Sequence, residues 1–361
     1  MSDHDTDTRR LVVKIGTSSL TNADGVIDVS AIERVVAEVA ELRARGHLVT
    51  VVTSGAIAAG LPALGLDAAA RPTDAQTLQA ISSIGQPALV ATWRAAFASA
   101  GVTVGQILLA PHNFGDRAQY LHARSTLTRL HELGVVPLVN ENDAVTDAEI
   151  RYGDNDRIAA LVANMVEADT LVLLTDTDGV LTADPNVDPN ASLIEEIREF
   201  AQVEDSVGGA GTVRGSGGMA SKLTAAKIAS RSGVRTVIAN AKRVGVVSAA
   251  VSGGAGVGTV VPAGTQTMSA RKLWIAFARP AVARLVVDDG ARAALSEGGR
   301  SLLAVGVSAT EGVFERRDAV EIAGLDGAVF AKGLARASHT EFAAETESTV
   351  VVHADDLVLL D

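Results

Sequence analysis

The sequence predicts an α/β fold, a three-layer α/β/α sandwich with a mostly parallel central sheet, followed by a small domain made mainly of β-strands. Two observations lead to this prediction. As far as about residue 265, short runs rich in β-branched residues alternate with helical stretches, and the runs are almost continuously apolar, as strands buried on both faces are. After the glycine-rich segment 253–258, short strand-like pieces alternate with turns that contain glycine and aspartate.

The larger part of the chain is expected to contain at least six strands and four helices. The strands are expected at residues 11–15, 48–52, 102–109, 135–139, 170–174 and 235–239. The helices are expected at residues 32–45, 116–133, 155–166 and 219–232. In a sheet of this kind, ligands bind at the carboxyl ends of the strands.

The domain boundaries are predicted from the change in composition. A catalytic domain is expected at 1–262, a linker at 263–278 and a β domain at 279–361. Strand-like pieces of the β domain fall at 284–287, 319–322, 328–331 and 349–352.

Composition narrows the class of protein. The 361 residues, 47% of them hydrophobic, are enough for two buried cores. The apolar runs stop well short of the roughly 20 residues of a membrane helix, and residues 1–10 are charged and lack a signal-peptide core, so a cytoplasmic protein without a membrane segment is expected. The absence of cysteine excludes disulfides and thiolate chemistry. A net charge of −12 disfavours a general nucleic-acid binder.

Small and hydroxyl residues follow the first two predicted strands. Lys14 is followed by Gly16 and Thr17, which can place an ammonium, backbone N–H groups and a hydroxyl around a phosphate. A strand that leaves the core through a polar turn explains the same residues. Ser54 and Gly55 follow the second strand, where small side chains let a ligand approach, although Ser54 also suits a helix N-cap.

Carboxylates and amides gather after the strand at 135–139. Residues 140–143 read Asn-Glu-Asn-Asp, and residues 152–156 read Tyr-Gly-Asp-Asn-Asp just where a helix is expected to begin. Such groups can orient the ammonium of an amino acid and hold lysines in place. Turns and a helix cap explain one or two of these residues, and the others point to a site.

Two further segments are of interest. Thr175 and Asp176 end another apolar strand, where an Asp-Gly turn at 178–179 favours a structural explanation when this segment is taken alone. Glycines at 215, 217 and 218 precede a helix that contains Lys222. Glycines before a helix N-terminus form an anion site that a lysine one turn later can reach. The glycine spacing matches neither a P-loop nor, without a preceding strand, a dinucleotide fold. The seven histidines show no metal-ligand spacing.

The order of these motifs resembles the amino-acid kinase family. From residue 14 to residue 222 the sequence reads K-x-G-T-S, V-T-S-G-A-I-A-A-G, N-E-N-D-A-V, Y-G-D-N-D, L-L-T-D and S-G-G-M-A-S-K. The resemblance is closest to the members that phosphorylate the γ-carboxylate of L-glutamate with ATP, the first step of proline biosynthesis. The C-terminal part resembles the PUA domain of many bacterial members. An amino-acid kinase-like sandwich with a PUA-like β domain is therefore implied.

The resemblance also implies roles at the matching positions. Lys14 and Lys222 are expected to flank the transferred phosphoryl group, with Asp156 between them. The residues expected to bind ATP are Lys14, Gly16, Thr17, Thr175, Asp176, Ser216, Gly217, Gly218, Met219, Ala220, Ser221 and Lys222. The residues expected to bind L-glutamate are Ser54, Gly55, Asp143 and Asn155. Mg²⁺ is expected on ATP oxygens and water, with no metal ligands from the protein. A homo-oligomer, either dimer or tetramer, and feedback inhibition by proline are implied as well.

Two groups of alternatives remain open at the level of sequence. An acetylglutamate, aspartate, carbamate or nucleotide monophosphate kinase shares the phosphate-handling motifs, although the serine in the second motif and the accessory domain favour glutamate. An RNA-binding protein that acts through the PUA-like domain belongs to a different class. Residues 271–361 hold 10 Lys and Arg against 14 Asp and Glu, a net charge of −4, which argues against RNA binding.

Overall fold

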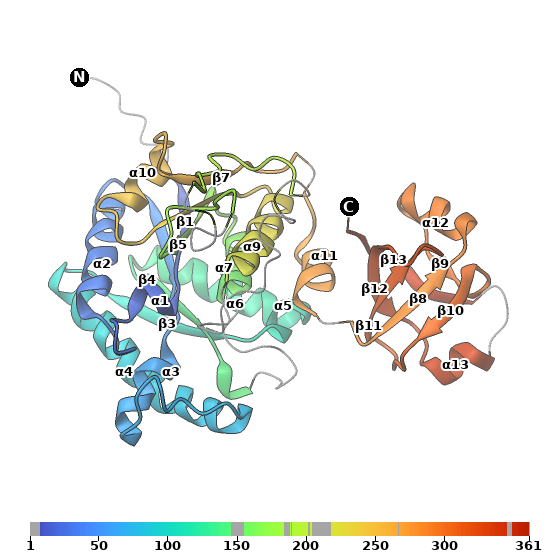
Figure 1. Ribbon diagram of the computed structural model, residues 1–361, viewed down its shortest axis with the longest axis horizontal. Coiled ribbons are helices and arrows are strands. Elements are labelled where there is room, and N and C mark those ends of the chain that lie inside the picture. The colour runs from blue at the N-terminus through green and yellow to red at the C-terminus, as the bar shows by residue number, and fades with distance from the viewer. Residues whose placement is uncertain are drawn as a thin grey trace. The chain divides into compact units, whose positions relative to one another are not determined.

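The computed structural model describes residues 8–145, 155–183, 188, 190–200, 203, 218–265, 267–279, 281–344 and 349–360. These residues form two compact units (Figure 1). The first lies within Met1–Asn113 and Ala118–Thr267, and the second within Phe114–Arg117 and Met268–Asp361. Each unit has its own sheet. None of the described helices has both the length and the apolar character needed to cross a lipid bilayer.

The larger sheet contains seven strands. They are β1 (Arg10–Ile15), β2 (Leu48–Val52), β3 (Val104–Leu109), β4 (Val136–Glu141), β5 (Thr170–Thr175), β6 (Arg235–Asn240) and β7 (Gly258–Val261). The helices of this part of the chain are α1 (Thr17–Leu20), α2 (Val29–Ala44), α3 (Ala56–Gly60), α4 (Ala75–Ser99), α5 (His112–Gly115), α6 (Arg117–Glu132), α7 (Asn155–Met165), α9 (Met219–Arg231) and α10 (Val246–Ser252), with short 3-10 segments η1 (Leu61–Leu64) and η2 (Asp143–Val145).

The strand order is β3-β4-β2-β1-β5-β6-β7, and every neighbouring pair is parallel except β6 and β7. The predicted α/β fold with a mostly parallel sheet is confirmed, and the six predicted strands and four predicted helices all form. The prediction did not include the antiparallel strand β7 or the 25-residue helix α4. Because β1 lies in the centre, Lys14 is flanked by β2 and β5, opposite Val52 and Leu173.

The two faces of the larger sheet carry different residues. Val13 of β1 lies in an apolar core together with Val36 of α2, Trp93 of α4 and Val247 of α10. Successive side chains of a strand point to opposite faces. Lys14, the next residue, therefore points to the other face, which α7 covers (Figure 1). The polar group at the end of β1 is thus placed by the same alternation that builds the core.

Helices α3 and α4 cross with their backbones in contact. A Cβ on Gly85 would lie 1.8 Å from the carbonyl oxygen of Ala56, and a Cβ on Gly60 would lie 2.2 Å from that of Ile81. Both distances are far inside van der Waals contact, so only glycine fits at the crossing. This crossing fixes α4 against the beginning of α3, directly after Ser54.

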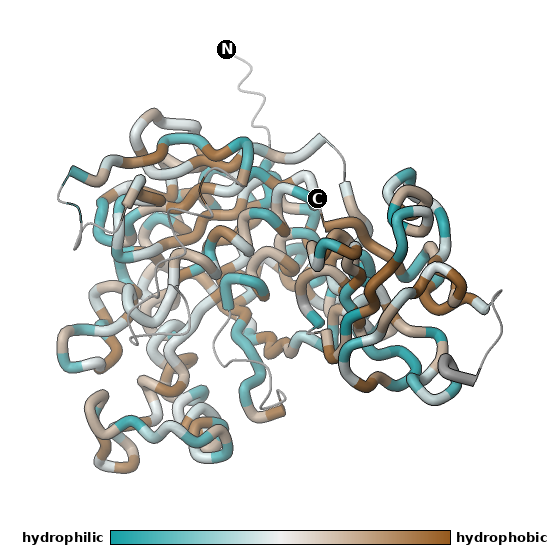
Figure 2. Tube along the Cα trace, turned by 45° about the vertical axis from the view of Figure 1, so that its right-hand side comes forward, coloured by the Kyte–Doolittle hydropathy of each residue, from teal (hydrophilic) through white to brown (hydrophobic). Residues whose placement is uncertain are grey.

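The second unit is built on a six-stranded sheet in the order β10-β8-β11-β12-β13-β9. Its strands are β8 (Ala283–Val287), β9 (Leu302–Leu303), β10 (Val307–Glu311), β11 (Ala319–Ala323), β12 (Val329–Ala335) and β13 (Val350–Leu359), and its other elements are α11 (Ala270–Leu273), the π-helix η3 (Trp274–Ala278), α12 (Asp289–Ser296), η4 (Ala304–Gly306) and α13 (His339–Ala344). The predicted mainly β character is confirmed. Figure 2 shows hydrophobic stretches running through the middle of each unit, and many residues of the strands are buried.

The domain boundaries at 262 and 278 stay a prediction. Residues up to Thr267 group with the first unit, and the second unit begins at Met268. The predicted linker contains both α11 and η3.

Candidate active site

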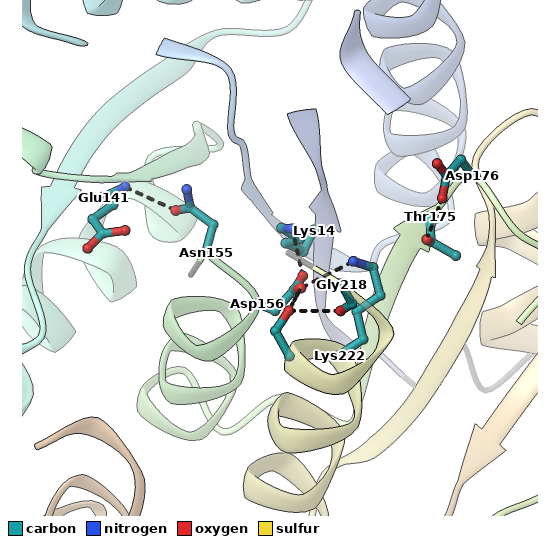
Figure 3. Close-up of polar contacts among 9 residues, drawn as sticks. Lys14, Glu141, Asn155, Asp156, Thr175, Asp176, Gly218 and Lys222 are labelled. Atoms are coloured by element: carbon teal, nitrogen blue, oxygen red, sulfur yellow. Dashed lines mark hydrogen bonds and ion pairs between the residues drawn. The ribbon is translucent and has the colours of Figure 1, made fainter. Parts of the chain in front are cut away.

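A buried ion cluster lies at the carboxyl end of β1 (Figure 3). The ammonium of Lys14 is 2.6 Å from Oδ1 of Asp156, and the ammonium of Lys222 is 3.3 Å from Oδ2. The exposed fractions are only 2%, 1% and 4% for Lys14, Asp156 and Lys222. These residues come from β1, α7 and α9, so the fold brings together charges that are far apart in the sequence.

Electrostatics keep Asp156 ionised. Burial raises the pKa of its carboxyl group, but the ammonium groups of Lys14 and Lys222 outweigh this effect and lower the pKa to about 2. Two buried ammonium groups meet at this carboxylate, in a place where charges are poorly screened by water. The cluster is therefore suited to bind an anion.

The start of α9 adds to this positive potential. Gly218 is the N-cap residue, and Ser221 in the first turn donates its hydroxyl to Oδ2 of Asp156 at 2.6 Å. The free N–H groups and dipole of a helix N-terminus favour anions. Met219 is half-buried and Ala220 exposed. Ser216 and Gly217, also expected to bind ATP, lie outside the described residues, as does the Tyr-Gly-Asp part of the motif at 152–156.

The ends of β1 and β5 carry the other residues expected near the nucleotide. Gly16 is buried, and a Cβ there would lie 3.3 Å from Nζ of Lys14, so glycine leaves space in front of the ammonium. Thr17 is exposed at the start of α1. The hydroxyl of Thr175 donates to Asp176 at 3.2 Å, and Figure 3 shows this pair at the end of β5, to one side of the lysines.

The residues expected to bind the acceptor lie at the ends of β2 and β4 and at the start of α7. Ser54 is 5% exposed, and Gly55 has φ of +102°, a left-handed conformation that favours glycine. Asn155, the first residue of α7, accepts a hydrogen bond from the backbone N–H of Glu141 at 3.1 Å (Figure 3). This bond ties the end of β4 to the helix that carries Asp156.

Helix α4 supplies two residues that the sequence analysis missed. Ser82 donates its hydroxyl to Oδ2 of Asp143 at 2.6 Å, and the Gln86 amide donates to the carbonyl oxygen of Glu141 at 3.3 Å. Ser82 could have been noticed in the sequence because it lies on the same helix face as the apolar residues Leu78, Ile81 and Leu89, all of which are buried. A buried hydroxyl needs a partner, so such a serine indicates a polar contact.

The structure therefore joins the expected residues in three groups by hydrogen bonds or ion pairs. Lys14, Asp156, Ser221 and Lys222 form one group, Asn155 and Glu141 a second, and Thr175 and Asp176 a third. Asp143 is joined to Ser82 of α4. Within the part of the chain that the structure describes, no cluster of three or more His, Asp or Glu side chains is arranged to hold a metal ion.

Two family profiles match the chain. The Amino acid kinase family profile matches residues 9–240, and the PUA domain profile matches residues 283–352. The chain belongs to the amino acid kinase family. A carbamate kinase from Giardia lamblia bound to AMP-PNP has the same fold, with a TM-score of 0.51 and 14% identity over 71% of this chain and 99% of that one.

Curated relatives match more of the chain. The glutamate 5-kinase of Paraburkholderia xenovorans is 43% identical over 369 residues, covering 98% of each chain. The glutamate 5-kinase of Chromobacterium violaceum is 46% identical over 333 residues, which cover 92% of this chain and 89% of the relative.

Proposed function

We propose that this protein uses ATP to phosphorylate the γ-carboxylate of L-glutamate, giving L-glutamyl 5-phosphate in the first step of proline biosynthesis. The observation that carries the proposal is the buried cluster of Lys14, Asp156 and Lys222 at the sheet edge where the acceptor-side residues also lie. The relatives that match almost the whole chain are named glutamate 5-kinase, which supports the choice of acceptor.

On the phosphate side, Lys14 and Lys222 neutralise the charge of the group being transferred. The γ-phosphoryl group spreads negative charge over its oxygens in the transition state. Fixed cations in a site that excludes water stabilise this charge strongly, because they need not reorganise during the reaction. Asp156 holds both ammonium groups in place before the substrates bind.

On the acceptor side, the chemistry needs alignment and no general base. The γ-carboxylate is ionised at neutral pH, so one of its oxygens can attack the γ-phosphorus while the bond from phosphorus to ADP breaks. Ser54, Gly55, Asp143 and Asn155 are proposed to hold glutamate. The carboxylate of Asp143 suits the substrate ammonium, and the other polar groups are proposed to orient the rest of the amino acid.

The phosphates of ATP are proposed to lie against Gly16, Thr17 and the segment from Ser216 to Lys222, with Thr175 and Asp176 beside the nucleotide. The space that Gly16 leaves before Lys14 fits this placement. Mg²⁺ is proposed to be held by ATP oxygens and water, which its reluctance to lose water favours, and it supplies further charge neutralisation when bound.

The family resemblance also supports a homo-oligomer in the cytoplasm, a dimer or tetramer, with proline competing for the glutamate site. Light scattering of the purified protein measures its oligomeric state. Glutamate saturation curves with and without proline test for inhibition by proline. Competition at the glutamate site raises the glutamate KM at constant kcat.

The proposed function is tested by the acceptor dependence of ADP formation. With Mg²⁺ and ATP present, L-glutamate should stimulate ADP release, and hydroxylamine should trap the acyl phosphate as a hydroxamate. Acetylglutamate, aspartate, carbamate and a nucleoside monophosphate serve as matched acceptors and represent the other activities of this fold. Preference for any of them over L-glutamate would overturn the proposal.

A further inference from the structure

Helix α4 supports the proposed acceptor side of the site at three points. Its Gly85 touches the backbone of Ala56 next to the Ser54 loop, Gln86 holds the carbonyl of Glu141, and Ser82 holds the side chain of Asp143. The first two points fix the backbone. Only Ser82 acts on a side chain that is proposed to bind glutamate.

Ser82 and Asp143 are both buried. Ser82 is 1% exposed and Asp143 is 7% exposed, and the distance from Oγ of Ser82 to Oδ2 of Asp143 is 2.6 Å. A short hydrogen bond from a hydroxyl to a carboxylate is a strong one. It restrains the rotation of the carboxylate, because Ser82 lies on a helix whose backbone packs closely against α3 at Gly85.

The hydrogen bond also favours the charged form of Asp143. Burial raises the pKa of Asp143 above its ordinary value, and the Ser82 hydroxyl and the guanidinium of Arg71 offset this rise only in part. Glu141 is the other buried carboxylate of this segment. A protonated Asp143 cannot attract an ammonium ion, so a donor at this position supports binding of an amino acid.

We propose that Ser82 is a positioning residue for the amino-acid substrate. By holding one oxygen of Asp143, it fixes the direction in which the other oxygen meets the ammonium group of glutamate. This inference rests on the proposed function, in which Asp143 binds that ammonium group. It assigns to α4 a part in selecting the acceptor, in addition to its packing role.

The test removes the Ser82 hydroxyl by a substitution that preserves helix α4. Ser82→Ala should raise the glutamate KM about tenfold or more, since hydrogen bonds to charged groups are among the stronger ones. Its kcat and its KM for ATP should stay close to those of the parent, because the hydroxyl contacts neither the lysine cluster nor the nucleotide-side residues described above. The acid limb of kcat/KM for glutamate should move to higher pH, because the pKa of Asp143 rises when the donor is lost while Arg71 and Glu141 are unchanged.

The neighbouring serine provides a matched control. Ser83 is exposed on the same helix, and its hydroxyl bonds to the carbonyl of Gln79 at 3.0 Å. Ser83→Ala removes the same atom and should leave the glutamate KM and the pH profile unchanged. Ser82→Thr keeps a hydroxyl and should recover much of the parent KM.

Three outcomes separate the possibilities. A folded Ser82→Ala enzyme with the parent glutamate KM and pH profile overturns the inference alone, provided the parent and Ser83→Ala phosphorylate glutamate. Equal increases in KM for glutamate and ATP, with a lower unfolding midpoint, also overturn it, since that pattern indicates a loosened helix. Parent protein that forms no glutamyl hydroxamate overturns the proposed function itself, and the inference with it.

Discussion

The two units bury lysine side chains in different ways. In the first unit, Lys14 and Lys222 meet the carboxylate of Asp156. In the second, Lys332 is 8% exposed and donates to the carbonyl oxygens of Ala276 and Arg279, at the end of η3. Carbonyl oxygens at the end of a helix are good acceptors for a lysine. The contrast separates two settings of the same side chain, one in which the ammonium is paired with a buried carboxylate and one in which it caps the carbonyl oxygens at a helix end.

The largest expected effect comes from the lysines of the first unit. Lys14→Met or Lys222→Met should lower kcat by about 10²–10³, because a preorganised donor at a developing anion contributes roughly 3–4 kcal/mol. The glutamate KM should change much less, since the loss is confined to the transition state. Steady-state kinetics measure both values.

The control for this test is an exposed lysine. Lys242→Met removes a similar charge from the surface and should fold as the parent does. Circular dichroism confirms folding of each variant. A folded Lys222→Met enzyme with a normal kcat would remove that lysine from the mechanism.

The next effect is a loss of stability in acid that depends on Asp156. Its pKa is lowered from 3.8 to about 2 by the fold, so its contribution is complete above pH 4 and disappears as the pH falls towards 2. A shift of this size corresponds to roughly 2 kcal/mol. Urea unfolding of the parent and of Asp156→Asn at each pH should show their stability difference shrinking by about this amount. A stability difference that stays constant between about pH 5 and about pH 2 contradicts the expectation.

A smaller effect is expected from Lys332. Lys332→Met leaves buried carbonyl oxygens at the end of η3 without this donor, at a cost of about 1–3 kcal/mol. The unfolding midpoint of the variant should fall, with kcat unchanged, because Lys332 belongs to the second unit. Lys242→Met again serves as the control. A drop in kcat at full stability would mean that this lysine also serves catalysis.

Removal of the second unit is also expected to change kcat very little. A chain that ends at Thr267 keeps every residue proposed to bind a substrate and the whole seven-stranded sheet. It should fold and phosphorylate glutamate with a kcat close to that of the full chain, since domains carry their own cores. Circular dichroism and ADP formation test this together, and a folded but inactive protein would show that the second unit takes part in the reaction.

Five of the six predicted strands of the larger sheet were predictable because they are mostly buried on both faces, whereas β3 is largely half-buried or exposed. β5, for example, is buried at all six positions, which gives a continuous apolar run in the sequence. β10 was missed because its residues are half-buried or exposed and show no such run. β7 was missed because it has only four residues and directly follows the glycine-rich segment 253–258.

The candidate site was predictable only in part. The glycine and lysine motifs pointed to a phosphate site, and the family resemblance placed Asp156 with Lys14 and Lys222. The structure shows how these three side chains meet, while their roles in catalysis stay predictions. Ser82 could not be linked to Asp143, because 61 residues separate them and no local pattern relates a position on one helix to a turn after a distant strand.

The sequence by itself determined most of the buried strands and four of the helices of the larger part of the chain, and which strand ends carry polar groups. Alternating burial and local hydrogen bonding are short-range properties, so they leave a period in the sequence. Only the tertiary structure decided which polar groups meet. The meeting of Lys14 with Asp156 depends on α7 packing over the central strand, and that of Ser82 with Asp143 depends on backbone contact at Gly85. Such contacts follow from the packing of whole elements, which is not encoded in any single segment.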